Sequence, residues 1–502
     1  MNRKTIIMGH HPLVKDLVRQ YEDRNFVVVQ QPTFLVEGIV LNDFDELCLL
    51  ADKDEDNKVV AMLAELAVTY DLDAHNGKKL ICHLLVQKNE TLRMLQTCDF
   101  CDAVRQKMDV YPFTMDEAWS RSIVLDYESI TMQSEKHVHL VVFGMGEMAE
   151  MVAIQAAHVA HYPNYVRNHS LRTRITMVDE HAESRSEGFI KRYQYLFDNS
   201  YYRIVKPSEE KAVVKFHKPQ YEGKREDFVD VEWEFVEAES WNMDVREKLQ
   251  LWVQDDRQLL TVVMSGQDGD KNMSEALHLP NELFKAQVPI YLYSQQEVSV
   301  KDCPNMHGFG MIHRGYDVAL PMVKMAKNVN YIYDRCYAEN FSEEQADVTN
   351  WSLRYAVEIN VGARERSWAK LTNVKRMSSL YNAMTIATKM RSIGLEDTDW
   401  EKFYDIPQQE IELLAEVEHN RWSVEELILG FRPCTEEEQA QIEADIRLKS
   451  VMKGRKIHYD LRAYNDLRPD QTGKSVKVYD RCLCSCLPLI AKTYSDEKGG
   501  ES

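Results

Sequence analysis

Short apolar runs alternate with amphipathic stretches through the first 125 residues of the chain. The runs have the length of buried parallel strands, and the stretches between them have the spacing of helices that bury one face. The predicted strands are 5–8, 26–29, 46–50 and 80–86, and the predicted helices are 13–21, 58–70 and 90–97. This alternation predicts a parallel α/β sheet.

The first turn of this unit argues against tight dinucleotide binding. Gly9-His10-His11-Pro12 follows the first strand but lacks the second and third small residues of a phosphate loop. His10 and His11 are candidates for a ligand contact, and a solvated turn is the alternative. We therefore expect residues 1–130 to form a degenerate Rossmann-like domain.

The same alternation returns after residue 136. The predicted strands are 140–143, 174–179, 229–236, 259–264 and 288–293, with helices at 151–160 and 243–254. Strands that alternate with helices favour a parallel sheet with helices on both faces. The predicted fold class is therefore α/β, with tandem Rossmann-like, doubly wound parallel sheets, and residues 136–330 are expected to form the nucleotide-binding one.

A glycine-rich turn joins the first strand of this second unit to its first helix. It has the sequence Gly144-Met145-Gly146-Glu147-Met148-Ala149, in the strand–turn–helix setting of a dinucleotide fingerprint. Gly144 permits the tight turn, Gly146 lets a pyrophosphate approach the backbone, and Ala149 lets the helix pack closely. The free N–H groups at the start of the helix would face the phosphates. A turn without a ligand is the alternative.

An acidic residue and a second turn complete the predicted nucleotide site. Asp179 ends the strand 174–179, where a carboxylate can bind ribose hydroxyls and favours an unphosphorylated ribose. The nearby Arg185 is a candidate to receive a ribose phosphate instead. The turn after strand 259–264 opens on the ligand side of the sheet. With NAD or a related adenine nucleotide as the expected cofactor, the predicted cofactor-binding residues are Gly144, Met145, Gly146, Glu147, Met148, Asp179, Glu180, Ser265 and Gly266.

The strand pattern ends near residue 330. Residues 331–405 predict a helical linker, in which Trp351, Leu353 and Tyr355 precede the basic segment 364–376. This segment either holds phosphate groups or forms a solvated helix face. Residues 408–494 predict a mainly helical C-terminal domain, with helices expected at 410–430, 436–449 and 480–491.

Composition limits the partners and the location of the protein. Of its 502 residues, 44% are hydrophobic and 28% are charged, as in ordinary soluble domains. The formal net charge of −20 repels phosphate backbones, so nucleic acid is not an expected partner. No apolar run approaches the ~18 residues of a membrane span, and the polar start is no signal peptide. With ten scattered cysteines, the chain is expected to be cytoplasmic, without membrane insertion and with reduced thiols.

No catalytic motif accompanies the predicted cofactor site. A dehydrogenase also needs a positioned acid or base and a substrate pocket. His158, His161 and Tyr193 are candidates for the acid or base, but the sequence has no nucleophile elbow, Walker loop or HExxH motif. Binding without turnover is therefore the leading hypothesis. An NAD(P)-dependent oxidoreductase is the alternative.

The cysteines and paired aspartates do not predict a metal site. Cys98-x-x-Cys101 is half a zinc site without a second pair, so a structural thiol pair is expected. The aspartates after strand 259–264 lack the spacing of a calcium loop. Core thiols, with redox sensing as the alternative, are expected at Cys482, Cys484 and Cys486.

The C-terminal helices carry motifs that resemble a ryanodine-receptor (RyR) repeat. Glu418-His419-Asn420-Arg421-Trp422, then Glu425 and Gly430-Phe431-Arg432, resemble the first helix of the repeat and the turn after it. This chain departs from the pattern in its longer link, 433–456, and in Phe431, which stands where Trp is commoner. A second set of motifs resembles the second half of the repeat: Ile457-His458-Tyr459-Asp460-Leu461, Tyr464, Leu467, Tyr479-Asp480-Arg481 and Leu487-Pro488.

Together with the glycine-rich turn, these motifs make residues 138–492 resemble bacterial fusions of a TrkA-N-type nucleotide-binding domain with an RyR domain. The resemblance implies a soluble, nucleotide-sensing regulatory protein in bacterial signalling or defence. A cytosolic regulator of potassium transport is an alternative that it also implies. By analogy with such regulators, we expect a homo-oligomer.

The first helix of the repeat suggests a second ligand site. His419 and Trp422 share one helix face, where an aromatic ring can stack on a base while nearby guanidinium groups bind phosphate. The alternative is that Trp422 is a core residue and His419 a satisfied helix histidine. The predicted ligand-binding residues of this domain are His419, Arg421, Trp422, Arg432, His458 and Tyr464.

Overall fold

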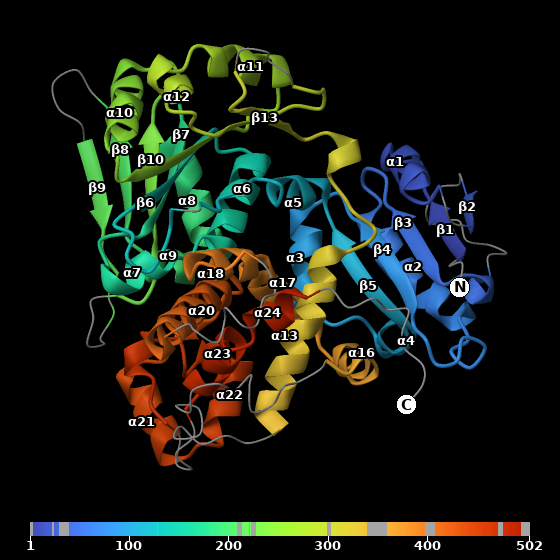
Figure 1. Cartoon of the computed structure of the whole chain (residues 1–502). Coiled ribbons are helices and arrows are strands. Elements are labelled where there is room, and N and C mark those ends of the chain that lie inside the picture. Colours follow the sequence, from blue (N-terminus) through green and yellow to red (C-terminus); the bar gives the residue numbers. More distant parts are fainter. Residues whose placement is uncertain are drawn as a thin grey trace.

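Two α/β sheets lie side by side, and the helices of the last third of the chain pack below both of them (Figure 1). The structure is a computed structural model. It describes residues 4–492 except 23–24, 30–39, 128, 208–212, 220, 222–226, 299–302, 339–358, 397–406 and 470–474. Trp351, Leu353 and Tyr355 therefore lie outside the described residues.

The first sheet has five parallel strands in the order β2-β1-β3-β4-β5. Its central strands are almost wholly buried, as expected for a parallel sheet with helices on both faces. Helix α1 covers one face, and α2, α3 and α4 cover the other. The elements are β1 (Lys4–Met8), α1 (Leu13–Gln20), β2 (Asn25–Val29), η1 (Leu41–Asp43), β3 (Glu46–Leu50), α2 (Asp56–Thr69), β4 (Leu80–Leu85), α3 (Asn89–Thr97), α4 (Asp102–Lys107), β5 (Met108–Phe113) and α5 (Met115–Ser120).

The second sheet has eight strands in the order β13-β12-β11-β6-β7-β10-β8-β9. All neighbouring pairs are parallel except β8 and β9, which form an antiparallel hairpin at one edge. Without this hairpin, the six parallel strands from β10 to β13 follow the order 3-2-1-4-5-6 along the chain. Its strands are β6 (His137–Phe143), β7 (Thr173–Asp179), β8 (Tyr202–Lys206), β9 (Val213–His217), β10 (Val231–Glu237), β11 (Gln258–Met264), β12 (Ile290–Tyr293) and β13 (Met306–Phe309).

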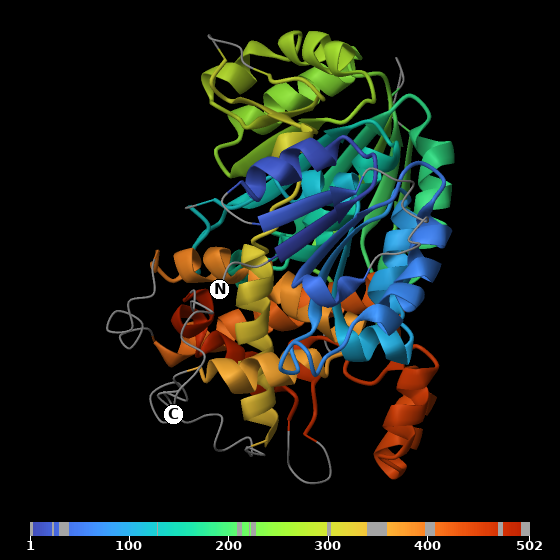
Figure 2. The same cartoon turned by 90° about the vertical axis from the view of Figure 1, so that its right-hand side faces the viewer.

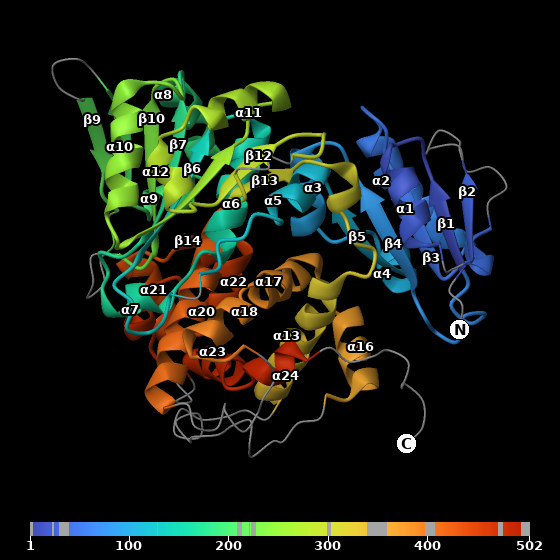
Figure 3. The same ribbon diagram turned by 45° about the horizontal axis from the view of Figure 1, so that its top comes forward.

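Helices cover both faces of this second sheet. Side chains of α6, α8 and α9 join one core layer, and those of α10, α11 and α12 join the other. Figure 3 shows the two layers on either side of the strands. The helices are α6 (Glu147–Val159), α7 (Pro163–Arg167), α8 (Ala182–Arg192), α9 (Gln194–Asp198), α10 (Met243–Gln254), α11 (Gly269–Leu277) and α12 (Asn281–Lys285).

The last third of the chain is helical, with one short two-stranded pairing of β14 and β15. Figure 2 shows these helices below the first sheet as well. The elements are η2 (Ile312–Arg314), α13 (Pro321–Ala338), α16 (Val361–Ala369), α17 (Asn373–Met384), α18 (Ile386–Ser392), α20 (Gln408–Ile428), β14 (Arg432–Pro433), α21 (Glu436–Ala444), α22 (Leu448–Gly454), β15 (Ile457–His458), η3 (Tyr464–Asp466), α23 (Lys477–Cys484) and α24 (Leu487–Ala491).

One apolar core connects the three parts of the chain. It contains Leu50 and Phe113 of the first sheet, Val142 of the second, and Val424 and Leu427 of α20. Helix α5 of the first unit packs on α6, and α17 and α20 pack on the same helix. The parts are therefore joined by shared packing, in addition to the chain that links them.

Most predicted elements of the two sheets are present. All nine predicted strands are found. The second sheet was predicted to be wholly parallel, but it is mixed, because β9 pairs antiparallel with β8 at its edge. The predicted helix 436–449 is interrupted at Asp445, whose backbone is extended. The predicted helix 480–491 is likewise divided, and Pro488 lies in the first turn of α24, where a missing N–H is tolerated. Within the described part of the chain, none of the helices is long and apolar enough to cross a membrane.

The two glycines of the β6–α6 turn should differ in their effect on stability. Gly144 has a φ of +104°, and a Cβ there would lie 3.2 Å from Oγ of Ser265, whereas a Cβ at Gly146 would meet nothing within 4 Å. We expect Gly144→Ala to cost about 1–3 kcal/mol of unfolding free energy, and Gly146→Ala to change it by less than about 0.5 kcal/mol. Urea unfolding of both variants measures this. Equal midpoints would contradict the strain assigned to Gly144.

Candidate functional site

The turn between β6 and α6 carries the predicted fingerprint. β6 is buried over its whole length, and Gly144 follows it with a φ of +104°, which glycine adopts without steric cost. The N–H of Gly144 donates to the carbonyl of Val178 on β7 (2.8 Å). Because Ser265 approaches so closely, this position needs glycine both for the turn and for the space beside β11.

Gly146 is the open position of the turn. It is the N-cap of α6 in an extended conformation, and no side chain caps the first N–H groups of the helix. A Cβ added at Gly146 would meet no other atom within 4 Å. Free N–H groups at a helix start attract anions. The start of α6 is therefore accessible to a ligand, as the fingerprint predicts.

Asp179 holds the turn from the end of β7. Its Oδ2 accepts hydrogen bonds from the N–H of Met145 (3.0 Å) and the guanidinium of Arg185 (2.6 Å). Its Oδ1 accepts from the N–H of His181 (2.9 Å). A carboxylate has about four acceptor positions, so Oδ1 retains one for a further donor such as a ribose hydroxyl. Arg185, the candidate for a ribose phosphate, is itself paired with Asp179.

The other predicted cofactor-binding residues differ in how far they are buried. Met145 and Met148 bury their side chains, so only their backbone faces the turn. Glu147, Glu180 and Gly266 are exposed. Ser265 is buried, and its hydroxyl donates to the carbonyl of Phe143 (2.7 Å), which joins the ends of β6 and β11. These residues therefore lie at the carboxyl ends of β6, β7 and β11, where the backbone offers most of the free donors.

The first α/β unit packs beside the helix that follows this turn. Helix α5 packs on α6, and Asp116 of α5 lies near Glu147. Burial and the charge of Glu147 raise the pKa of Asp116, against a hydrogen bond from Asn89. The candidate nucleotide site thus lies between the two sheets.

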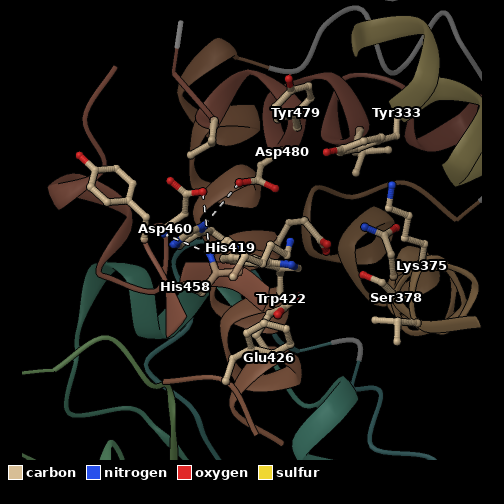
Figure 4. A pocket seen from close by; sticks show the side chains of 18 of the residues that line it. Tyr333, Lys375, Ser378, His419, Trp422, Glu426, His458, Asp460, Tyr479 and Asp480 are labelled. Atoms are coloured by element: carbon tan, nitrogen blue, oxygen red, sulfur yellow. Dashed lines mark hydrogen bonds and ion pairs between the residues drawn. The ribbon is translucent and has the colours of Figure 1, made fainter. Parts of the chain in front are cut away.

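A cavity of about 740 Å³ lies among the C-terminal helices. Side chains from α13, α17, α20, α22, α23 and β15 surround it (Figure 4). Four of the six residues predicted to bind a ligand in this domain line the cavity, namely His419, Arg421, Trp422 and His458. Arg432 and Tyr464 are not part of the lining.

Trp422 lies at the centre of this group and is half-buried. Its ring makes a T-shaped contact with His458, with centroids 4.9 Å apart, and lies 5.5 Å from the ring of His419. Part of the indole therefore remains accessible from the cavity. This favours the pocket over the alternative that Trp422 is wholly a core residue.

Three buried side-chain atoms in the lining lack a hydrogen-bond partner among the described residues, namely Nε2 of His458, Oε2 of Glu426 and Oδ1 of Asn382. Nδ1 of His458 accepts from the N–H of Asp460 (3.2 Å), and burial lowers the pKa of His458 to about 3. The ring is therefore neutral with its proton on Nε2, which has no partner among the described residues. Oε2 of Glu426 is likewise unpartnered there, and burial raises the pKa of Glu426 to about 7, against the opposing charge of Lys453.

The structure corrects the expected role of the arginines. The guanidinium of Arg421 is fully buried and donates to Glu418 and Glu425 on its own helix. Lys389 also pairs with Glu418, and these two cations hold the pKa of Glu418 at about 2 although burial opposes this. Arg432 forms a two-pronged pair with Glu438. Neither arginine offers a free guanidinium to a phosphate.

Tyr464 and His419 also have partners inside the protein. The hydroxyl of Tyr464 donates to Glu412 (3.1 Å), and its buried ring packs 5.7 Å from the ring of His419. Nε2 of His419 bonds to the carbonyl of Arg462 (2.8 Å), and Nδ1 lies 3.6 Å from Asp480. Tyr464 therefore supports His419 from behind the cavity.

Two lysines of the cavity were not predicted as ligand-binding residues. Lys453 lies in 433–456, which we treated as an inserted link, yet it lines the cavity. Lys375 belongs to the basic segment 364–376 and also lines the cavity, while Arg364 and Arg376 of that segment pair with Glu365 and Asp109. No local pattern distinguishes these two lysines from other surface lysines.

The candidates for a catalytic acid or base either lie far from the glycine turn or already interact with other side chains. His158 stacks on Tyr381 of α17 (centroids 3.8 Å apart) near the end of α6 opposite the turn. His161 follows that helix and bonds to Asp230. The hydroxyl of Tyr193 accepts from Arg93, and burial raises its pKa. None of the three has the environment of a general base.

The cysteines follow the predictions in part. Cys98 and Cys101 are exposed free thiols, so they are not the structural pair that we expected. Cys482, Cys484 and Cys486 are buried, as predicted for core thiols, and Cys482 contacts Cys336 (Sγ–Sγ 2.9 Å). In the described ranges, no group of three or more His, Cys, Asp or Glu side chains is arranged to hold a metal ion.

No protein-family model matches the chain, and neither a curated protein nor a solved structure is significantly similar to it. The TrkA-N-like and RyR-like assignments therefore stay predictions from the quoted motifs. The geometry of the two sites is what bears on function.

The ionisation of Glu426 should lower the free energy of unfolding of the protein as the pH rises. Its pKa in the folded protein, about 7, lies above the ordinary value of 4.5, so the unfolded chain ionises first. Stability is then lost between about pH 4.5 and 7, by an amount on the order of 3 kcal/mol. We expect Glu426→Gln to be more stable than the wild type at pH 8, with the difference shrinking as the pH falls toward 4.5.

Guanidinium unfolding at a series of pH values measures this difference. Glu437→Gln, an exposed acid on α21, is the control and should follow the wild type at each pH. A Glu426→Gln curve parallel to the wild type at all pH values would contradict the raised pKa.

Proposed function

We propose that the protein is a nucleotide-sensing regulatory protein that binds NAD or a related adenine nucleotide at the β6–α6 turn and a second small ligand among its C-terminal helices. The proposal covers binding and regulation, without turnover of the nucleotide. The observation that carries it is the open Gly146 backbone at the uncapped start of α6.

The position of the turn in the sheet supports this proposal. The six parallel strands have the order 3-2-1-4-5-6, which is the order of doubly wound dinucleotide-binding sheets. In that arrangement, ligands bind outside the carboxyl ends of the strands where the strand order reverses. Here the reversal falls between β6 and β11, and Gly144 and Ser265 end these two strands. We therefore infer a Rossmann-type arrangement for the second unit, with the turn at its ligand-binding point.

The end of β7 supports a ribose contact. Asp179 lies beside β6, and its Oδ1 has room for one more donor after the bond from His181. Arg185, the candidate to receive a ribose phosphate, is instead paired with Asp179. NAD, ADP-ribose or ATP therefore fits better than NADP.

The alternative of an oxidoreductase has less support. Hydride transfer also needs an acid or base near the reacting carbon of the substrate. His158 and His161 lie at the far end of α6 and are held by Tyr381 and Asp230. The C-terminal cavity beside Trp422 instead supports a second binding site, as a sensor of two signals would need.

Gly146→Val should abolish nucleotide binding at the turn and leave the fold intact. The branched side chain would fill the space that a pyrophosphate needs, and it meets no protein atom. We expect affinity for NAD and ADP-ribose at this site to fall at least about 10-fold in calorimetry. Gly188→Val, at an exposed glycine of α8 whose added Cβ also meets nothing, is the matched control. Wild-type affinity in Gly146→Val would show that the nucleotide does not bind at this turn.

A further inference from the structure

The cavity beside Trp422 contains a donor and an acceptor that the protein does not satisfy. Both Nε2 of His458 and Oε2 of Glu426 are buried, and neither has a hydrogen-bond partner among the described residues. Nδ1 of His458 is occupied by the N–H of Asp460, so the ring proton is on Nε2, and His458 lines the cavity. Burying such groups without a partner is energetically costly. A ligand that pairs with both would recover this cost.

The unpaired charge next to these groups is positive. Several of the other charged side chains in the lining form pairs, such as Lys449 with Asp460 (2.8 Å) and Arg468 with Glu443 (3.0 Å), whereas Lys375 is unpaired among the described residues. Lys453 is exposed and makes no ion pair with any described residue. It is close enough to Glu426 and His458 to lower the pKa of both groups. Its ammonium is therefore available to an anion at the same end of the cavity.

An accessible aromatic face lies between these groups. Trp422 is half-buried, and Figure 4 shows its ring near Glu426 and His458. A flat ring can stack on an indole and be held by hydrogen bonds at its edge. The cavity volume of about 740 Å³ lies within the range of small-molecule pockets.

We propose that this cavity binds a planar nitrogen heterocycle that carries an anionic group. The ring lies against Trp422, a ring nitrogen accepts a hydrogen bond from Nε2–H of His458, an N–H of the ring or of its amino group donates to Glu426, and the anionic group pairs with Lys453. This inference deepens the proposed function, since it rests on the C-terminal ligand site, but it is independent of the β6–α6 turn.

AMP is a suitable probe, because adenine places a ring acceptor beside an amino donor and the nucleotide carries a phosphate. Calorimetry uses the full chain with Gly146→Val, which blocks the other site, and compares AMP, adenosine and inorganic phosphate. We expect AMP to bind more tightly than adenosine. Adding Lys453→Ala should weaken AMP about 10-fold and leave adenosine unchanged. Arg455→Ala removes an adjacent exposed charge outside the lining and should change neither.

The outcomes separate the two sites. If AMP does not bind the Gly146→Val chain, the cavity assignment is overturned, while loss of NAD binding between the wild type and Gly146→Val would still support the turn. If Lys453→Ala and Arg455→Ala have the same effect, or if Lys453→Ala weakens adenosine as much as AMP, the cavity does not hold the anionic group as proposed. If Lys453→Ala weakens AMP binding and Gly146→Val leaves NAD binding unchanged, the cavity site is supported and the nucleotide site at the β6–α6 turn is wrong.

Discussion

Helix α6 is packed on nearly all sides, and the positions of both candidate sites depend on this packing. Nine of its residues are buried, from Met148 to His158. It contacts β6, α5, α17 and α20, which belong to all three parts of the chain. A helix buried all round must be apolar all round, and small residues let its neighbours approach. The buried small residues are Ala149, Ala153, Ala156 and Ala157.

Gln155 and His158 are the two buried polar residues of α6, and His158 shows how the helix accommodates a polar side chain. His158 is buried, and its pKa is held well below the usual value by burial and by the nearby charge of Arg421. The ring stays neutral and stacks flat on Tyr381 of α17 (interplanar angle 6°). A protonated histidine in this place would be an unpaired buried charge, which is costly. The contact therefore functions as an aromatic pair that joins α6 to the C-terminal helices.

This packing connects the two sites through few elements. The N-terminus of α6 forms the glycine turn, and its C-terminal half lies on α17 and α20. Helix α17 carries Lys375 and Ser378 into the cavity lining, and α20 carries Trp422 and Glu426. The buried network of Arg421, Glu418 and Lys389 fixes α20 beside α18. Packed helices of one core therefore connect the two sites.

The sequence predicted what depends on local pattern. All nine predicted strands and the turn at Gly144 were found because buried parallel strands and positive-φ glycines leave local signals. Among the described residues, the four missed strands of the two α/β sheets lack a long apolar run: β5 contains Asp109 and Pro112, β13 contains Gly308, and β8 and β9 form the hairpin at the sheet edge. The cavity was only partly foreseen. His458 and Trp422 came from a family resemblance, while Lys453 joins them only through tertiary packing, and the ion pairs of Arg421 and Arg432 depend on burial and neighbours that the motif does not show.

The central claim is that a nucleotide binds across the ends of β6 and β11. Hydrogen–deuterium exchange of the full chain, with and without saturating ADP-ribose, tests it most directly, because the proposed contacts are mostly backbone N–H groups. The account predicts slower exchange of the amides of 146–148 and 266 when the nucleotide is present, because the amides of Gly144, Met145 and Ser265 already donate within the protein. Unchanged exchange in both segments at saturation would contradict it.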